Sequence, residues 1–167
     1  MWLPNKKSCL ALAVMLGSAL SAMAEVKVGQ PFPRLDAFGL EGALPETSGK
    51  VVLVDFWASW CAPCRASFPS YSTLQKELAA QGFVLVAVSV DKQAGAYGDF
   101  LKKYAPGFAT VRDATQRLAA EVKVPGMPTS YLIDRHGVLR AVHVGFHGDS
   151  SVREIRDQIV RLLEEKP

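Results

Sequence analysis

Two continuous apolar runs dominate the pattern of hydrophobic and polar positions, at residues 51–57 and at residues 83–90. A run without alternating polar residues predicts a strand that is buried on both faces. Residues 62–80 between them predict a helix with a kink at Pro69. The inward face of this helix is expected to carry Ala66, Phe68, Leu74 and Leu78. A strand, a helix and a strand in this order predict a parallel βαβ unit.

The remaining segments predict shorter elements that extend this unit. The expected helices are residues 95–104, 115–122 and 149–165, and the expected strands are residues 108–111, 129–134 and 138–144. Only Arg135-His136-Gly137 separates the last two strands, which predicts an antiparallel hairpin. Residues 25–50 are rich in Gly and Pro and predict loops with short strands. Together these elements predict one α/β domain over residues 25–167.

The first 24 residues have the pattern of a leader for export. Lysines at positions 6 and 7 precede an apolar run at residues 9–20, and alanines at positions 22 and 24 form a small-residue cleavage pattern. We therefore predict a signal peptide over residues 1–24 and a periplasmic location. The alternative is a retained anchor with the domain facing the periplasm, although a spanning helix needs ~20 mostly apolar residues.

Composition and charge narrow the classes of function. The chain has 167 residues, of which 49% are hydrophobic and 21% are charged, which is typical of a globular protein. Its formal net charge is +3, and without the two leader lysines 17 basic residues stand against 16 acidic ones, or +1. We therefore expect no binding to nucleic acid, and contact with a membrane only through an uncleaved leader.

Two of the three cysteines, Cys61 and Cys64, remain in the predicted mature chain. They lie where the first strand ends and the following helix begins. The first turn of a helix has unpaired backbone N–H groups and the positive end of the helix dipole, and both favour thiolate over thiol. We therefore predict that Cys61 is the nucleophile of disulfide exchange. Cys64, one turn further into the helix, is expected to resolve the mixed disulfide by attacking Cys61.

Other uses of this cysteine pair fit the sequence less well. A zinc site needs four ligands, and none of the three histidines has ligand spacing to the cysteines. We expect His143 and His147 to be hairpin residues that face the same way. Covalent haem attachment needs a histidine directly after the second cysteine, where Arg65 stands. A structural disulfide stays open, although so short a loop adds little stability. We expect no metal, nucleotide or haem cofactor.

The sequence around the cysteines closely resembles the active-site segment of thioredoxins, over residues 54–64 (VDFWASWCAPC). Gly126-Met127-Pro128-Thr129 resembles the loop that carries a cis proline facing the disulfide in that fold. The leader, the Gly/Pro-rich extension and the insertion at residues 91–123 resemble the TlpA/ResA/CcmG branch of extracytoplasmic thioredoxin-like proteins. This resemblance implies a thioredoxin fold, with a central mixed β-sheet flanked by helices, an N-terminal extension and an inserted α/β segment.

The resemblance also implies roles for residues around the disulfide. The residues expected to contact the substrate are Trp60, Pro63, Met127, Pro128 and Thr129. Asp55 matches the buried acid that exchanges a proton with the second cysteine in thioredoxins. Independently of the resemblance, a carboxylate inside an apolar strand must be paired or protonated with a raised pKa, unless it reaches solvent at the strand end. Residues 86–88 lack the lysine that thioredoxins place beside this acid.

The activity that the resemblance implies is thiol–disulfide exchange, with a disulfide-containing protein as substrate and a membrane thiol–disulfide carrier as electron donor. Members of this branch are generally reductants, often in cytochrome c maturation, and the proline at position 63 favours that direction. The alternatives are a disulfide-forming oxidant, a thiol peroxidase and a non-catalytic binding module. Ala58 stands where peroxidatic sites generally place a threonine.

Overall fold

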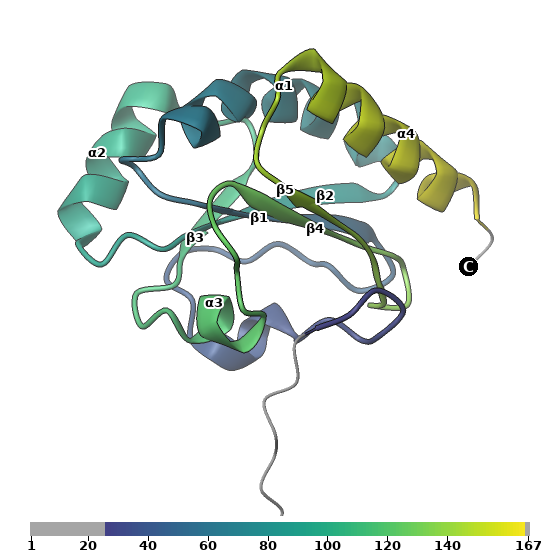
Figure 1. Ribbon diagram of the computed structural model, residues 1–167, viewed down its shortest axis with the longest axis horizontal. Helices are drawn as coiled ribbons and strands as arrows, with labels where there is room; N and C mark the ends of the chain where they lie inside the picture. The colour runs from purple at the N-terminus through teal and green to yellow at the C-terminus, as the bar shows by residue number, and fades with distance from the viewer. Residues whose placement is uncertain (1–25, 166–167) are drawn as a thin grey trace, which may run out of the picture.

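A five-stranded mixed sheet forms the centre of the computed structural model, which describes residues 26–165 (Figure 1). The strands are β1 (Val51–Trp57), β2 (Phe83–Ser89), β3 (Ala109–Arg112), β4 (Thr129–Ile133) and β5 (Leu139–Val144). Their order in the sheet is β3-β2-β1-β4-β5, so β1 lies in the middle. β2 pairs parallel with β1, and β3 pairs parallel with β2. β4 pairs antiparallel with β1, and β5 pairs antiparallel with β4.

Helices cover both faces of this sheet (Figure 1). One face carries α1 (Ala62–Leu78), α2 (Ala94–Tyr104) and α4 (Asp149–Glu164). The other face carries α3 (Arg117–Glu121) and the 3-10 helix η1 (Leu35–Phe38), and η2 (Ala79–Gln81) follows α1. The predicted mixed sheet with flanking helices is confirmed, and the predicted strands agree with the observed ones to within two residues. The predicted signal peptide, residues 1–24, lies outside the described part of the chain.

The central strand β1 has the two buried faces that its apolar run predicts, since all seven of its residues are buried. Its side chains alternate between the layers. Trp57 contacts Phe68 of α1, with ring centroids 5.1 Å apart. Phe56 points to the opposite layer and contacts Tyr131, with ring centroids 5.7 Å apart. Asp55, two residues before Trp57, therefore faces the layer that contains α1.

The buried face of α1 differs from the predicted one. Its members are Cys64, Ser67, Phe68, Tyr71, Leu74 and Leu78. The prediction was right for Phe68, Leu74 and Leu78, but Ala66 is exposed. With 3.6 residues per turn, a face that contains Cys64 repeats at positions 67–68 and 71, and position 66 falls outside it. The helix continues through Pro69, and residues 79–80 belong to η2.

The N-terminal extension joins the sheet at two isolated bridges, where the sequence predicted loops with short strands. Pro31 bridges to Val138, beside β5. Glu41 and Arg112 exchange backbone hydrogen bonds of 2.9 and 2.8 Å at the outer edge of β3. The extension also contains the unpredicted helical turn η1. Thus the extension holds both edges of the sheet.

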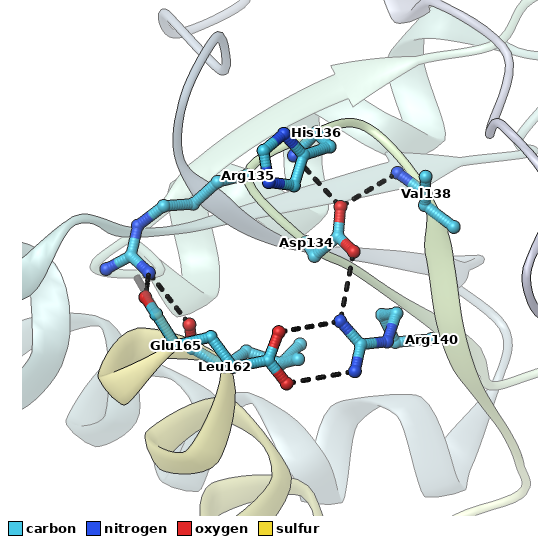
Figure 2. A network of polar contacts seen from close by, with 7 residues as sticks. All are labelled: Asp134, Arg135, His136, Val138, Arg140, Leu162 and Glu165. Atoms are coloured by element: carbon cyan, nitrogen blue, oxygen red, sulfur yellow. Dashed lines mark hydrogen bonds and ion pairs between the residues drawn. The ribbon is translucent and has the colours of Figure 1, made fainter. Parts of the chain in front are cut away.

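An arginine fastens the end of α4 to the turn between β4 and β5 (Figure 2). The guanidinium group of Arg135 donates hydrogen bonds of 2.8–2.9 Å to the backbone carbonyl oxygens of Leu162, Leu163 and Glu165. The last carbonyl groups of a helix have no partner within the helix, so Arg135 supplies donors that water would otherwise supply. Arg140 adds two hydrogen bonds to the Glu165 carboxylate, of 2.8 and 2.9 Å.

We expect Arg135→Ala to lower the free energy of unfolding by about 1–3 kcal/mol, because three carbonyl groups lose charged donors. Urea denaturation measures this change. Arg153→Ala is the matched control, because Arg153 is an exposed arginine within α4, the helix whose end Arg135 contacts. Its replacement should change the free energy of unfolding by less than about 0.5 kcal/mol. Equal effects of the two substitutions would contradict the capping role.

Candidate active site

Cys61 and Cys64 form a disulfide at the N-terminus of α1, with Cα atoms 5.3 Å apart. Cys61 is the N-cap residue, and its Sγ accepts a hydrogen bond of 3.3 Å from the backbone N–H of Cys64. Both cysteines are buried, Cys61 at 4% exposure and Cys64 at 0%, and their attacking and resolving roles stay a prediction. In the reduced protein, the N–H donor and the helix dipole favour the thiolate of Cys61.

The loop at residues 126–128 lies at the same end of the sheet as the disulfide. In the register of β1 and β4, Thr129 stands opposite Phe56, next to the end of β1 from which the chain continues to Cys61. The Met127–Pro128 peptide bond is cis, as the resemblance implies. The hydroxyl group of Thr129 donates a hydrogen bond of 2.7 Å to the carbonyl oxygen of residue 126, which fixes the loop.

Aromatic and apolar side chains next to the disulfide reach the surface. Trp60 is 71% exposed, so packing in the core does not explain it. Pro63 is exposed and Met127 is half-buried, whereas Pro128 and Thr129 are buried. The surface next to the cysteines is therefore suited to contact with another molecule, and the substrate contacts of these five residues stay a prediction.

Asp55 is fully buried in β1, with Ala87 of β2 and Ser130 of β4 as its cross-strand partners. Its Oδ1 accepts a hydrogen bond of 2.6 Å from the Ser130 hydroxyl, and its Oδ2 has no hydrogen-bond partner within residues 26–165. Burial raises the pKa of Asp55 to about 7, against the lowering effect of the Ser130 hydrogen bond. Asp55 therefore does not reach solvent, which excludes the alternative of an exposed acid at the strand end, and one of its two oxygens is paired. Its proton exchange with Cys64 stays a prediction.

A second hydroxyl group, which the sequence did not predict, extends this buried contact. The Tyr71 hydroxyl lies 3.1 Å from Ser130 Oγ, and both side chains are buried. Tyr71 lies on the buried face of α1, two turns after Cys64. Burial, with a smaller contribution from Asp55, raises the pKa of Tyr71 above its ordinary value. The sequence offers only one signal for this contact: Tyr71 and Ser130 are polar residues at positions where α1 and β4 are otherwise mostly apolar.

Asp91, also missed, holds the loop that precedes the cysteines. Its carboxylate accepts two hydrogen bonds of 2.9 Å from Ser59, one from the backbone N–H and one from the hydroxyl group. It accepts a third, of 2.8 Å, from the Ser89 hydroxyl at the end of β2. Because Ser59 lies two residues before Cys61, Asp91 fixes the path of the chain into the active site.

The histidines and Arg65 take no part in this arrangement. His143 lies in β5 with its Nε2 2.9 Å from Gln158 Oε1, whereas His147 lies after β5 and not in the predicted hairpin. Arg65 is exposed. In the described part of the chain, no group of three or more His, Cys, Asp or Glu side chains could hold a metal ion. No helix between residues 26 and 165 is long and apolar enough to cross a membrane.

A cleft of about 490 Å³ lies apart from the disulfide. Its walls come from the N-terminal extension, from Val52 and Val54 of β1, and from the turn at residues 134–137. This turn follows β4, whose other end carries the cis proline loop, so the cleft and the cysteines lie at opposite ends of the sheet. None of the candidate site residues lines this cleft, and the reactive groups lie at the disulfide.

A CxxC disulfide at a helix N-terminus, on a mixed sheet of this order, defines a thiol–disulfide oxidoreductase of the thioredoxin fold. The sequence comparison gives its relationship: the chain belongs to the AhpC/TSA family, whose sequence profile matches residues 28–142. The predicted thioredoxin-like membership and enzymatic class are thereby confirmed.

Individual relatives agree with this class. The chain is 31% identical over 124 residues to the thiol-disulfide oxidoreductase ResA of Bacillus subtilis, covering 74% of this chain and 69% of that protein. It is 29% identical over 168 residues to the thiol:disulfide interchange protein DsbE of Pseudomonas aeruginosa, covering 95% and 91% of the two chains. A solved structure from Chlorobium tepidum, which carries the name thiol:disulfide interchange protein DsbE, matches with a TM-score of 0.77. That pair is 37% identical, over 83% of this chain and 99% of the other.

Proposed function

We propose that this chain is a periplasmic reductant that transfers two electrons from its cysteine pair to a disulfide of a partner protein. The observation that carries the proposal is the position of the pair. Cys61 caps a helix beside an exposed tryptophan, while Cys64 lies behind it on the same buried helix face as Tyr71, whose hydroxyl belongs to the Asp55 contact. This arrangement combines an attacking thiolate, a protected resolving thiol and a nearby proton acceptor.

The reaction has two exchange steps. First, the Cys61 thiolate attacks one sulfur of the partner's disulfide; a bond forms between Cys61 and that sulfur, and the other sulfur leaves as a thiolate. Second, Cys64 gives its proton to Asp55 and attacks Cys61 Sγ, which releases the remaining partner sulfur as a thiolate. The partner thiolates take up protons, and the chain is left with the Cys61–Cys64 disulfide.

The proposed binding mode uses the cis proline loop and Trp60. An extended segment of the partner would pair with the backbone of Met127, ahead of Pro128, while Trp60 and Pro63 cover the attacked disulfide. The exposure of Trp60 and the position of the loop at the end of β1 support this mode.

The proposed setting is extracytoplasmic. The predicted signal peptide over residues 1–24 and the resemblance to the TlpA/ResA/CcmG branch support export, re-reduction by a membrane thiol–disulfide carrier, and a role in cytochrome c maturation. The measured reduction potential tests the direction of transfer. A value near the −270 mV of thioredoxin is expected for a reductant, and a value near the −120 mV of DsbA would instead make the chain an oxidant.

We expect Cys64→Ala to trap partner proteins as covalent adducts through Cys61, because the second exchange step is then impossible. The adducts are detected by non-reducing electrophoresis of periplasmic extract after acid quenching, and dithiothreitol should release them. Cys61→Ala is the matched control and should give none. Absence of adducts with Cys64→Ala would favour a non-covalent binding module, and rapid peroxide consumption by the unmodified chain would favour a peroxidase.

A further inference from the structure

While Asp55 is charged, the hydrogen bonds between Asp55, Ser130 and Tyr71 have a fixed direction. A carboxylate can only accept hydrogen bonds, so the Ser130 hydroxyl must donate its single proton to Asp55 Oδ1, 2.6 Å away. Ser130 Oγ is then an acceptor, and the Tyr71 hydroxyl, 3.1 Å away, must be its donor. The chain of donors therefore runs from α1 through β4 to β1 and ends on one oxygen of the acid.

This chain makes the two carboxylate oxygens of Asp55 different. Oδ1 is held by Ser130, whereas Oδ2 has no hydrogen-bond partner among the residues that the structure describes. Rotation of the carboxylate would exchange the two oxygens but would break the Ser130 hydrogen bond in a buried site, which is costly. Oδ2 is therefore the oxygen that is available to a proton.

We propose that Ser130, oriented by Tyr71, is a positioning residue of the exchange reaction: it holds the Asp55 carboxylate so that Oδ2 takes up the proton of Cys64. This inference rests on the proposed function and adds residues to it. In the second exchange step, the Cys64 proton passes to Oδ2 while the Cys64 sulfur attacks Cys61 Sγ. The bond from Cys61 to the partner breaks, and the partner's sulfur leaves as a thiolate.

Few other polar groups face Asp55, so Ser130 has a large influence on it. The cross-strand partner in β2 is Ala87, and α4, which also packs against β1, contributes buried Ile155 and Ile159. Among the side chains of α1, α4, β2 and β5 that are not exposed, the titratable ones are Cys64 and Tyr71 of α1 and His143 of β5, which stands opposite Ser130. The Ser130 hydrogen bond favours the charged form and opposes burial, which keeps the acid able to accept a proton near neutral pH.

The test is the pH dependence of partner release by Ser130→Ala. The reduced protein is mixed with a disulfide peptide in a single turnover, and the attack by Cys61 and the later release of peptide are followed separately from pH 5 to pH 9. In the unmodified chain, release should speed up with rising pH as Asp55 loses its proton. In Ser130→Ala the inflection should move upward by about one pH unit and release at pH 7 should slow about fivefold, with the first step unchanged.

Three further variants separate positioning from packing. Ser130→Thr keeps the hydroxyl group and should restore the original inflection. Tyr71→Phe keeps the ring and should move the inflection in the same direction by a smaller amount, which tests the inference even if Ser130→Ala does not fold. Asp55→Asn should remove the inflection, and adding Ser130→Ala to it should change nothing further.

The outcomes distinguish the inference from the proposed function. If Asp55→Asn removes the inflection but Ser130→Ala and Tyr71→Phe leave it in place, the positioning role is wrong and the exchange mechanism stands. If Asp55→Asn itself leaves the inflection and the rate of release unchanged, the proton transfer to Asp55 is wrong as well.

Discussion

The oxidised protein should lose on the order of 4 kcal/mol of stability as the pH rises from about 4 to about 8, and Asp55→Asn should abolish that loss. The pKa of Asp55 is raised from 3.8 to about 7, chiefly by burial. Between these two values the folded state holds a proton that the unfolded state has released, so each pH unit lowers the free energy of unfolding by about 1.4 kcal/mol. The stability that the protonated Asp55 contributes is fully present below pH 3.8 and is lost as the pH rises through about 7.

Urea denaturation without reductant, at intervals from pH 4 to pH 8, measures this effect as the difference between the unmodified chain and Asp55→Asn. The amide has the shape of the carboxyl group, can still accept from Ser130 and carries no charge at any pH. Asp99→Asn is the matched control, because Asp99 is an exposed aspartate of α2 and should leave the fall intact. Parallel pH profiles of the unmodified chain and Asp55→Asn would show that Asp55 is not the group responsible.

A different group, Glu165, affects the free energy of unfolding at acid pH. Hydrogen bonds from Arg140 hold the pKa of Glu165 below its ordinary value, so this contact is lost as the pH falls through that lowered pKa. The effect has the opposite sign to that of Asp55 and lies at lower pH. The two contributions therefore do not overlap between pH 5 and pH 8.

The chemistry of the site was predictable because it depends on local order along the chain. An apolar run followed by CAPC predicts a strand that delivers a cysteine to a helix N-terminus, and the same run makes Asp55 conspicuous as a lone acid. The position of Cys61 at a helix N-terminus and the burial of Asp55 can both be predicted without knowing any tertiary contact. Burial of the strand on both faces is also enough to predict a raised pKa for Asp55.

The partners of these residues were not predictable, because they depend on register between distant segments. Ser130 meets Asp55 only in the antiparallel register of β1 and β4, across 75 positions of sequence. Ala66 was assigned to the wrong face because the apolar residues of α1 leave its helical phase uncertain, and the phase is set by Cys64 and Ser67. The hydrophobic pattern of a segment thus predicts that a helix or strand forms there better than it predicts which side of that element is buried.

Asp91 links the active-site loop to the N-terminal extension, through its carboxylate on one side and its backbone carbonyl oxygen on the other. Arg112 donates hydrogen bonds to the backbone carbonyl oxygens of Asp91 and Lys92, of 3.2 and 2.9 Å, and also contacts the carboxylate of Glu41. Asp91 in turn binds Ser59, ahead of the cysteines. The extension, the edge strand β3 and the loop before Cys61 thus form one continuous set of polar contacts.

We therefore expect Asp91→Ala to cost about 3 kcal/mol or more in the free energy of unfolding and to slow the first exchange step. The substitution removes three hydrogen bonds and leaves the N–H and hydroxyl groups of Ser59 and the hydroxyl of Ser89 without their acceptor in a largely buried site. Asp91→Asn retains one acceptor oxygen and should cost less, while Asp99→Ala, at an exposed position, should change neither quantity. Urea denaturation and the alkylation rate of reduced Cys61 are the measurements. A loss below about 1 kcal/mol with an unchanged alkylation rate would mean that the loop keeps its conformation without Asp91, and that the helix N-terminus alone positions the nucleophile.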